Sequence, residues 1–68
     1  MTNQNFLKHL GLEIKISRIR KDLSRKQVAE KTGLTQDTIG NIENGANSYI
    51  LNYKRIADAL EVDIKQFM

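Results

Sequence analysis

The stretch from Gly33 to Gly45 constrains the fold more than any other part of the sequence, and it reads GLTQDTIGNIENG. Glycine tolerates the left-handed backbone conformation that commonly ends a helix, so the two glycines are expected to bound a short helix. Thr35 is a good N-cap, because its hydroxyl can accept a hydrogen bond from a backbone N–H that the helix leaves free. Asp37 lies in the first turn, where the positive end of the helix dipole favours an acid. The stretch therefore predicts a helix over about residues 35–44.

This helix is expected to have two chemically different sides. At about 100° per residue, Ile39 and Ile42 fall on one side, with threonines at its flanks. The opposite side is polar and carries short side chains: Gln36, Asp37, Gly40, Asn41 and Asn44. Asparagine and glutamine offer both donors and acceptors, which a contact with the edge of a DNA base requires. Gly40 lowers the stability of a helix, so its presence on the exposed side suggests that another molecule approaches closely there. The alternative is an ordinary solvated face.

Apolar spacing predicts two helices before this stretch. The first covers about residues 6–21 and follows residues 1–5, which are polar and expected to be disordered. Ser24 and Gln27 have the spacing of a capping box, which predicts a second helix that ends near Thr32.

Two further helices are expected after Gly45. Ser48 is expected to cap a helix over about residues 49–60, whose inner face holds Ile50, Tyr53, Ile56, Ala57 and Leu60. Asp63 is expected to cap a short final helix over about residues 64–68, with Ile64 and Phe67 turned inward. No stretch of the sequence has the pattern of a strand.

The first helix carries two apolar stripes. One stripe holds Leu7, Leu10 and Ile14, and the other, nearly opposite, holds Leu12, Ile16 and Ile19. A single core needs only one of them. The second stripe is therefore expected to contact a tail, the last helix or another subunit.

The positive charge of the chain is concentrated in its first half. Residues 1–31 contain eight Lys or Arg and three Asp or Glu, whereas residues 32–68 contain three and five. Arg25 and Lys26 lie in the first turn of a predicted helix, where cations oppose the helix dipole and a bound phosphate would offset them. This asymmetry indicates a basic flank and a partner that carries phosphates, with a solvated surface of mixed charge as the alternative.

Composition excludes several classes of protein and site. With 68 residues the chain is expected to form one domain, and without cysteine it has no disulfide and no thiolate metal site. His9 is the only histidine, and neither a P-loop nor a GxGxxG motif occurs, so no enzyme activity, metal, cofactor or small-molecule ligand is expected. No apolar run could span a membrane and the N-terminus lacks signal-peptide features, so a cytoplasmic location is expected.

The segment from Leu23 to Gly45 resembles the helix-turn-helix of the Cro/phage-repressor-like regulators, the XRE family. Agreement with the family pattern occurs at apolar, small and capping positions: Leu23, Ser24, Val28, Ala29, Gly33, Leu34, Thr35, Ile39, Ile42, Glu43, Asn44 and Gly45. The flanking segments agree as well, so the resemblance covers about residues 10–67. It implies a compact, all-α, lambda-repressor-like domain of five helices over residues 1–68. The motif would occupy about residues 24–44, and its second helix would enter the DNA major groove.

The resemblance also implies which residues contact DNA. The positions that match base-reading sites are Gln36, Asp37, Gly40 and Asn41. Contacts to the DNA backbone are expected from Arg25, Lys26, Thr35, Asn44 and Lys54. Arg18 and Glu43 match a pair that often forms an internal ion pair. The chain departs from many relatives because it carries Arg25 in place of glutamine and Ala46 in place of lysine or arginine, and residues 32–53 contain no cation. Its loop before the fourth helix is slightly short and lacks the usual proline.

The leading hypothesis is a sequence-specific regulator of transcription, expected to be a repressor, that binds double-stranded DNA as a homodimer at a two-fold operator. One small module makes few base contacts, and a second half-site about 34 Å away would supply the rest. The dimer surface is expected at Leu12, Ile16 and Ile19 of the first helix or at the last helix. The alternative is an antitoxin, or another protein-interaction module of a toxin–antitoxin or phage system, that binds DNA secondarily.

Overall fold

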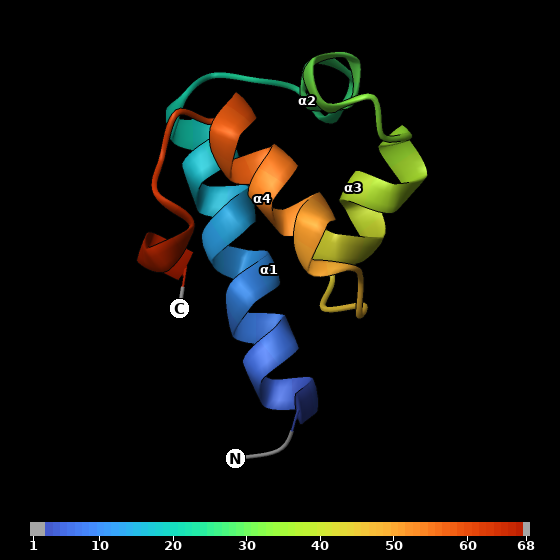
Figure 1. The fold of residues 1–68 in the computed structure, drawn as a ribbon, viewed down its shortest axis with the longest axis vertical. Helices are drawn as coiled ribbons and strands as arrows, with labels where there is room; N and C mark the ends of the chain where they lie inside the picture. The colour runs from blue at the N-terminus through green and yellow to red at the C-terminus, as the bar shows by residue number, and fades with distance from the viewer. Residues whose placement is uncertain (1–2, 68) are drawn as a thin grey trace.

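The computed structural model describes residues 3–67 and contains four α-helices followed by a short 3-10 helix (Figure 1). Their bounds are α1 Asn3–Arg20, α2 Arg25–Thr32, α3 Gln36–Glu43, α4 Ile50–Ala59 and, for the 3-10 helix, η1 Ile64–Phe67. The expected all-α fold is confirmed, with a 3-10 helix in place of the fifth α-helix. Residues 3–5, expected to be disordered, form the start of α1, while residues 1, 2 and 68 lie outside the described part.

The elements surround one apolar core. In Figure 1, α2 and α3 lie to one side of the long α1, and η1 returns to its other side. Each element contributes buried side chains, which are Leu10, Ile14, Val28, Ala29, Ile39, Ile42, Tyr53, Ile56, Ala57, Leu60 and Phe67. Leu10 and Ile14 confirm the expected inner stripe of α1, whereas Leu12 and Ile19 on its other stripe are 51% and 56% exposed. The core therefore uses only one stripe of α1.

Left-handed residues end the helices around this core. Asp22 has φ 57°, and the N–H groups of Asp22 and Leu23 donate to Ile19 O and Arg18 O at 2.9 and 3.1 Å. This is a Schellman motif, and its apolar residue, Leu23, packs against the core. Glu61 repeats the arrangement after α4 with φ 59°. Neither turn contains glycine, so hydrogen bonding and core packing offset the strain of the left-handed backbone there.

The start of α4 differs from the prediction. Tyr49 rather than Ser48 occupies the N-cap position, and its side chain makes no capping hydrogen bond. Ser48 Oγ instead accepts a hydrogen bond from Asn52 Nδ2 at 2.8 Å. Ile50, expected on the inner face of α4, is exposed. The expectation was wrong because the helix begins one residue later than its spacing indicated, and its first turn projects beyond the core.

A glycine sets how closely α1 approaches the end of α3. A Cβ atom added at Gly11 would collide with the backbone carbonyl oxygens of Ile42 and Glu43. Gly11 is buried, and α1 and α3 pack directly against each other. Gly11 therefore allows the close contact that positions α3.

We predict opposite effects for the same substitution at two helical glycines. Gly11→Ala should lower the free energy of unfolding by about 1–3 kcal/mol, because rigid backbone must move to admit the methyl group. Gly40→Ala should leave it unchanged or raise it by up to about 1 kcal/mol, because alanine favours a helix and its Cβ would meet only ordinary contacts. Urea denaturation of both variants measures this, and equal effects would contradict the close α1–α3 contact.

Candidate nucleic-acid interface

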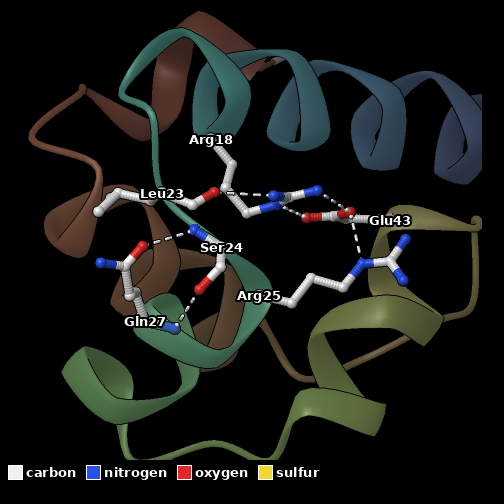
Figure 2. Close-up of polar contacts among 6 residues, drawn as sticks. All are labelled: Arg18, Leu23, Ser24, Arg25, Gln27 and Glu43. Atoms are coloured by element: carbon white, nitrogen blue, oxygen red, sulfur yellow. Dashed lines mark hydrogen bonds and ion pairs between the residues drawn. The ribbon is translucent and has the colours of Figure 1, made fainter.

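Local hydrogen bonds define the helix-turn-helix formed by α2 and α3. Ser24 Oγ accepts from Gln27 N at 3.0 Å and Ser24 N donates to Gln27 Oε1 at 2.8 Å, which confirms the capping box (Figure 2). Gly33 adopts φ 78° and donates to Ala29 O at 2.9 Å, so α2 ends where the sequence predicted. Thr35 Oγ1 accepts from Thr38 N at 3.1 Å and caps α3. These bonds fix the turn between the two helices.

The two sides of α3 separate as its spacing predicted. Ile39 and Ile42 are fully buried in the core. The expected base-reading residues lie away from it, because Gln36, Asp37 and Asn41 are exposed and Gly40 is partly exposed. Asn44, which follows the helix, is exposed as well. The structure thus brings these amide, carboxylate and glycine positions together on one open face.

A buried carboxylate at the end of α3 joins three helices. Arg18 on α1 donates to Glu43 through Nε at 2.6 Å and through Nη2 at 3.2 Å, which forms the ion pair that the resemblance implied. Arg25 on α2 donates to the same carboxylate through Nε at 3.1 Å (Figure 2). The Glu43 side chain is 0% exposed, so both arginines compensate for the burial of its charge.

The sequence did not reveal this second bond to Glu43. Arg25 was expected to point outward to the DNA backbone, and its side chain is 41% exposed. Its guanidinium also lies beside Gly40, since a Cβ added there would be 3.7 Å from Arg25 Nη1. Arg25 and Glu43 lie 18 positions apart in the chain, so no helical spacing could have indicated their contact.

The other expected backbone-contacting residues have different surroundings. Lys26 is exposed, and it makes no hydrogen bond or ion pair within residues 3–67. Lys54 Nζ lies 3.3 Å from Asp58 Oδ2 in an exposed pair one helical turn apart, which stabilises little and leaves the lysine accessible. Thr35 uses its hydroxyl in the cap and donates to Thr38 Oγ1 at 2.9 Å.

The loop after α3 is attached to α4 by one buried tyrosine. Tyr53 Oη donates to Ala46 O at 3.4 Å. Burial raises the pKa of the Tyr53 hydroxyl, and a backbone hydrogen bond at Ser48 partly opposes that rise. The phenol therefore stays protonated and holds the loop at neutral pH. Within residues 3–67, no three His, Asp or Glu side chains lie together so that they could hold a metal ion.

Comparison with known proteins assigns a family to this geometry. The helix-turn-helix family HTH_3 matches residues 14–67. The chain belongs to the XRE family of helix-turn-helix proteins. This XRE-family chain is a DNA-binding transcriptional regulator, and the open face of α3 is its candidate DNA-reading surface. No curated protein matches the chain. Within residues 3–67, no helix is long and apolar enough to cross a membrane.

Solved structures of XRE-type regulators share the fold. The restriction-modification controller protein C.AhdI from Aeromonas hydrophila has a TM-score of 0.87 and 27% identity, over 91% of this chain and 96% of that chain. The restriction-modification controller protein C.Esp1396I has a TM-score of 0.82 and 30% identity, over 91% and 82%. An HTH_3 family transcriptional regulator from Vibrio cholerae has a TM-score of 0.86 and 28% identity, over 97% of this chain and 38% of that chain.

The Glu43 network of this XRE-family chain makes a graded prediction for stability. Glu43→Ala should lower the free energy of unfolding by about 3–5 kcal/mol, because Arg18 keeps its charge in a site where it is only 11% exposed. Arg25→Ala should lower it by at most about 1 kcal/mol, since water reaches that side chain. Chemical denaturation of the two variants measures the difference. If Arg25→Ala lowers the free energy of unfolding more than Glu43→Ala does, the contact between α2 and α3 contributes more to stability than the buried Arg18–Glu43 pair.

Proposed function

We propose that this chain is a sequence-specific repressor that binds a two-fold DNA operator as a homodimer. The observation that carries the proposal is the polar face of α3, which is open to solvent while the opposite face is fixed in the core. Gln36 and Asn41 can each pair with adenine through two hydrogen bonds, and Asp37 can accept one from cytosine N4. A rigid helix with such a face suits base reading in the major groove.

Affinity for any DNA sequence would come from contacts to phosphates. Lys26 and Lys54 supply exposed cations on the two helices that flank α3. Thr35 and Asn44 lie at the two ends of α3, where their polar groups can approach the DNA backbone. Each cation that neutralises a phosphate releases counterions, so binding should weaken as salt rises. A cation-free α3 leaves most of this attraction to neighbouring helices.

A homodimer would supply the contacts that one module lacks. A good two-bond contact to a base contributes about 1–3 kcal/mol, and a single α3 offers only a few. Of the expected α1 stripe, Leu12 and Ile19 are exposed and Ile16 is half-buried. In η1, Lys65 and Gln66 are exposed, so each expected dimer surface has side chains that a second copy could contact. Similarity to two restriction-modification controllers over most of their length supports placing the chain among small regulators of this kind.

A second candidate function is a protein-interaction module that binds DNA only secondarily, such as an antitoxin. It is favoured by three exposed apolar residues in succession, Tyr49, Ile50 and Leu51, close to a recognition helix without cations. An apolar surface of this kind suits a protein partner. Copurification of one stoichiometric partner, together with weak and unselective DNA binding, would favour this function over the first.

Selection from a random duplex library at about physiological salt tests the proposed function. The purified chain should enrich a two-fold motif whose half-sites are separated by about one helical turn, roughly 10 base pairs. Sedimentation at the same concentrations should show a dimer on the selected duplex. Enrichment of a single half-site would contradict the homodimer, and the absence of any motif would contradict sequence-specific binding.

Single substitutions separate base-reading from backbone contacts. Asn41→Ala and Gln36→Ala should each weaken binding to the selected operator by about 1–3 kcal/mol and leave binding to random DNA nearly unchanged. Lys26→Ala should weaken both and lower the slope of log affinity against log salt by about one. Fluorescence anisotropy titrations over a salt series measure these effects. If Asn41→Ala weakens both duplexes equally, Asn41 does not read a base.

A further inference from the structure

The recognition face of α3 has a gap that a residue from α2 overlies. Gly40 provides no side chain at the centre of the face, and α3 carries no cation of its own. The Arg25 guanidinium lies at this gap, since the Cβ position of Gly40 is 3.7 Å from Nη1 and 3.8 Å from Cζ of Arg25. A side chain from another helix thus borders the place where α3 has none.

The hydrogen bonds of the two arginines show which one is free to contact DNA. Arg18 uses Nε and Nη2 on Glu43 and Nη1 on Leu23 O at 2.8 Å, so all three of its nitrogens are bonded. Arg25 uses only Nε, and its two terminal nitrogens make no hydrogen bond within residues 3–67 (Figure 2). One carboxylate also balances only one of the two guanidinium charges. The more exposed Arg25 therefore keeps a positive charge and a free edge.

We propose that Arg25 reads a guanine in the major groove through the space that Gly40 leaves open, and that Glu43 is the residue that positions it. The inference rests on the proposed function, and it gives Arg25 a base-reading role in place of the backbone role that the family resemblance implied. The two terminal nitrogens match the paired acceptors O6 and N7 of guanine. No other base presents two acceptors there in the major groove.

The bond to Glu43 is what makes Arg25 suitable for reading a base. A free arginine on a surface has many rotamers and can follow any phosphate, at an entropic cost when it is fixed. Here Nε is bonded to a fully buried carboxylate, so the guanidinium is held beside α3 before DNA binds. The fixed group lies beside Gly40, which matches a base-reading position of the family and comes one helical turn after Gln36. Its position therefore fits a base edge within one continuous reading surface.

Selection from the random library with three proteins tests this inference. The wild-type motif should contain a guanine in each half-site whose preference is lost in Arg25→Met, because methionine keeps an unbranched chain of similar length but has no N–H donor for O6 or N7. The matched control is Lys31→Ala, which removes an exposed cation of the same helix that the proposed interface does not use, and it should leave every base preference intact. Loss of folded protein cannot imitate the expected result, because it lowers binding to all sequences by the same factor.

A modified base gives a second and more specific measurement. Replacing that guanine with 7-deazaguanine removes the N7 acceptor alone, and should weaken wild-type binding by about 5-fold or more while leaving Arg25→Met unaffected, because methionine has no donor for N7. Equal weakening of both proteins, a motif without guanine, or guanine preferences that survive in Arg25→Met would each overturn the inference and leave the proposed function standing. A wild-type chain that selects no motif would overturn both.

Discussion

The buried carboxylate of Glu43 is the interaction on which the arrangement of the first three helices depends. Removing a charge from water is costly, and that cost is offset only when charged partners and hydrogen bonds surround it. Arg18 from α1 and Arg25 from α2 meet that requirement at 2.6 and 3.1 Å. Because Glu43 ends α3, the same three bonds that satisfy its charge also fix the recognition helix relative to both of its neighbours.

Close packing and charge act together at this point of the structure. Gly11 lets α1 approach the backbone of Ile42 and Glu43, which brings the end of α3 within reach of Arg18. A larger residue at position 11 would separate the two helices and stretch a bond that needs short, well-aligned geometry. The close backbone contact at Gly11 therefore creates the conditions under which the ion pair stabilises the fold.

The parts of the structure that could be predicted are those governed by neighbours in the sequence. The Ser24 capping box, the left-handed Gly33, the Thr35 cap and the two faces of α3 follow from hydrogen bonds and periodicity within a few residues. The Arg25–Glu43 bond and the role of Gly11 depend on contacts between distant segments, which no local pattern encodes. The start of α4 was misplaced because Ser48, the expected cap, accepts a hydrogen bond from the Asn52 side chain instead, and Tyr49 at the N-cap position makes no capping bond.

Gly11 and Gly40 show why a residue type alone does not reveal its role. Both weaken their helices to a similar degree by intrinsic propensity. At Gly11 the backbone of α3 occupies the space that a side chain would need, so the fold requires the glycine. At Gly40 the space borders only the Arg25 guanidinium at 3.7 Å and solvent, and a Cβ there would make ordinary contacts, so nothing in the folded chain requires the glycine. Gly40 disfavours the helix and the fold does not need it. Its place at the centre of the proposed DNA surface is therefore best explained by the close approach of DNA.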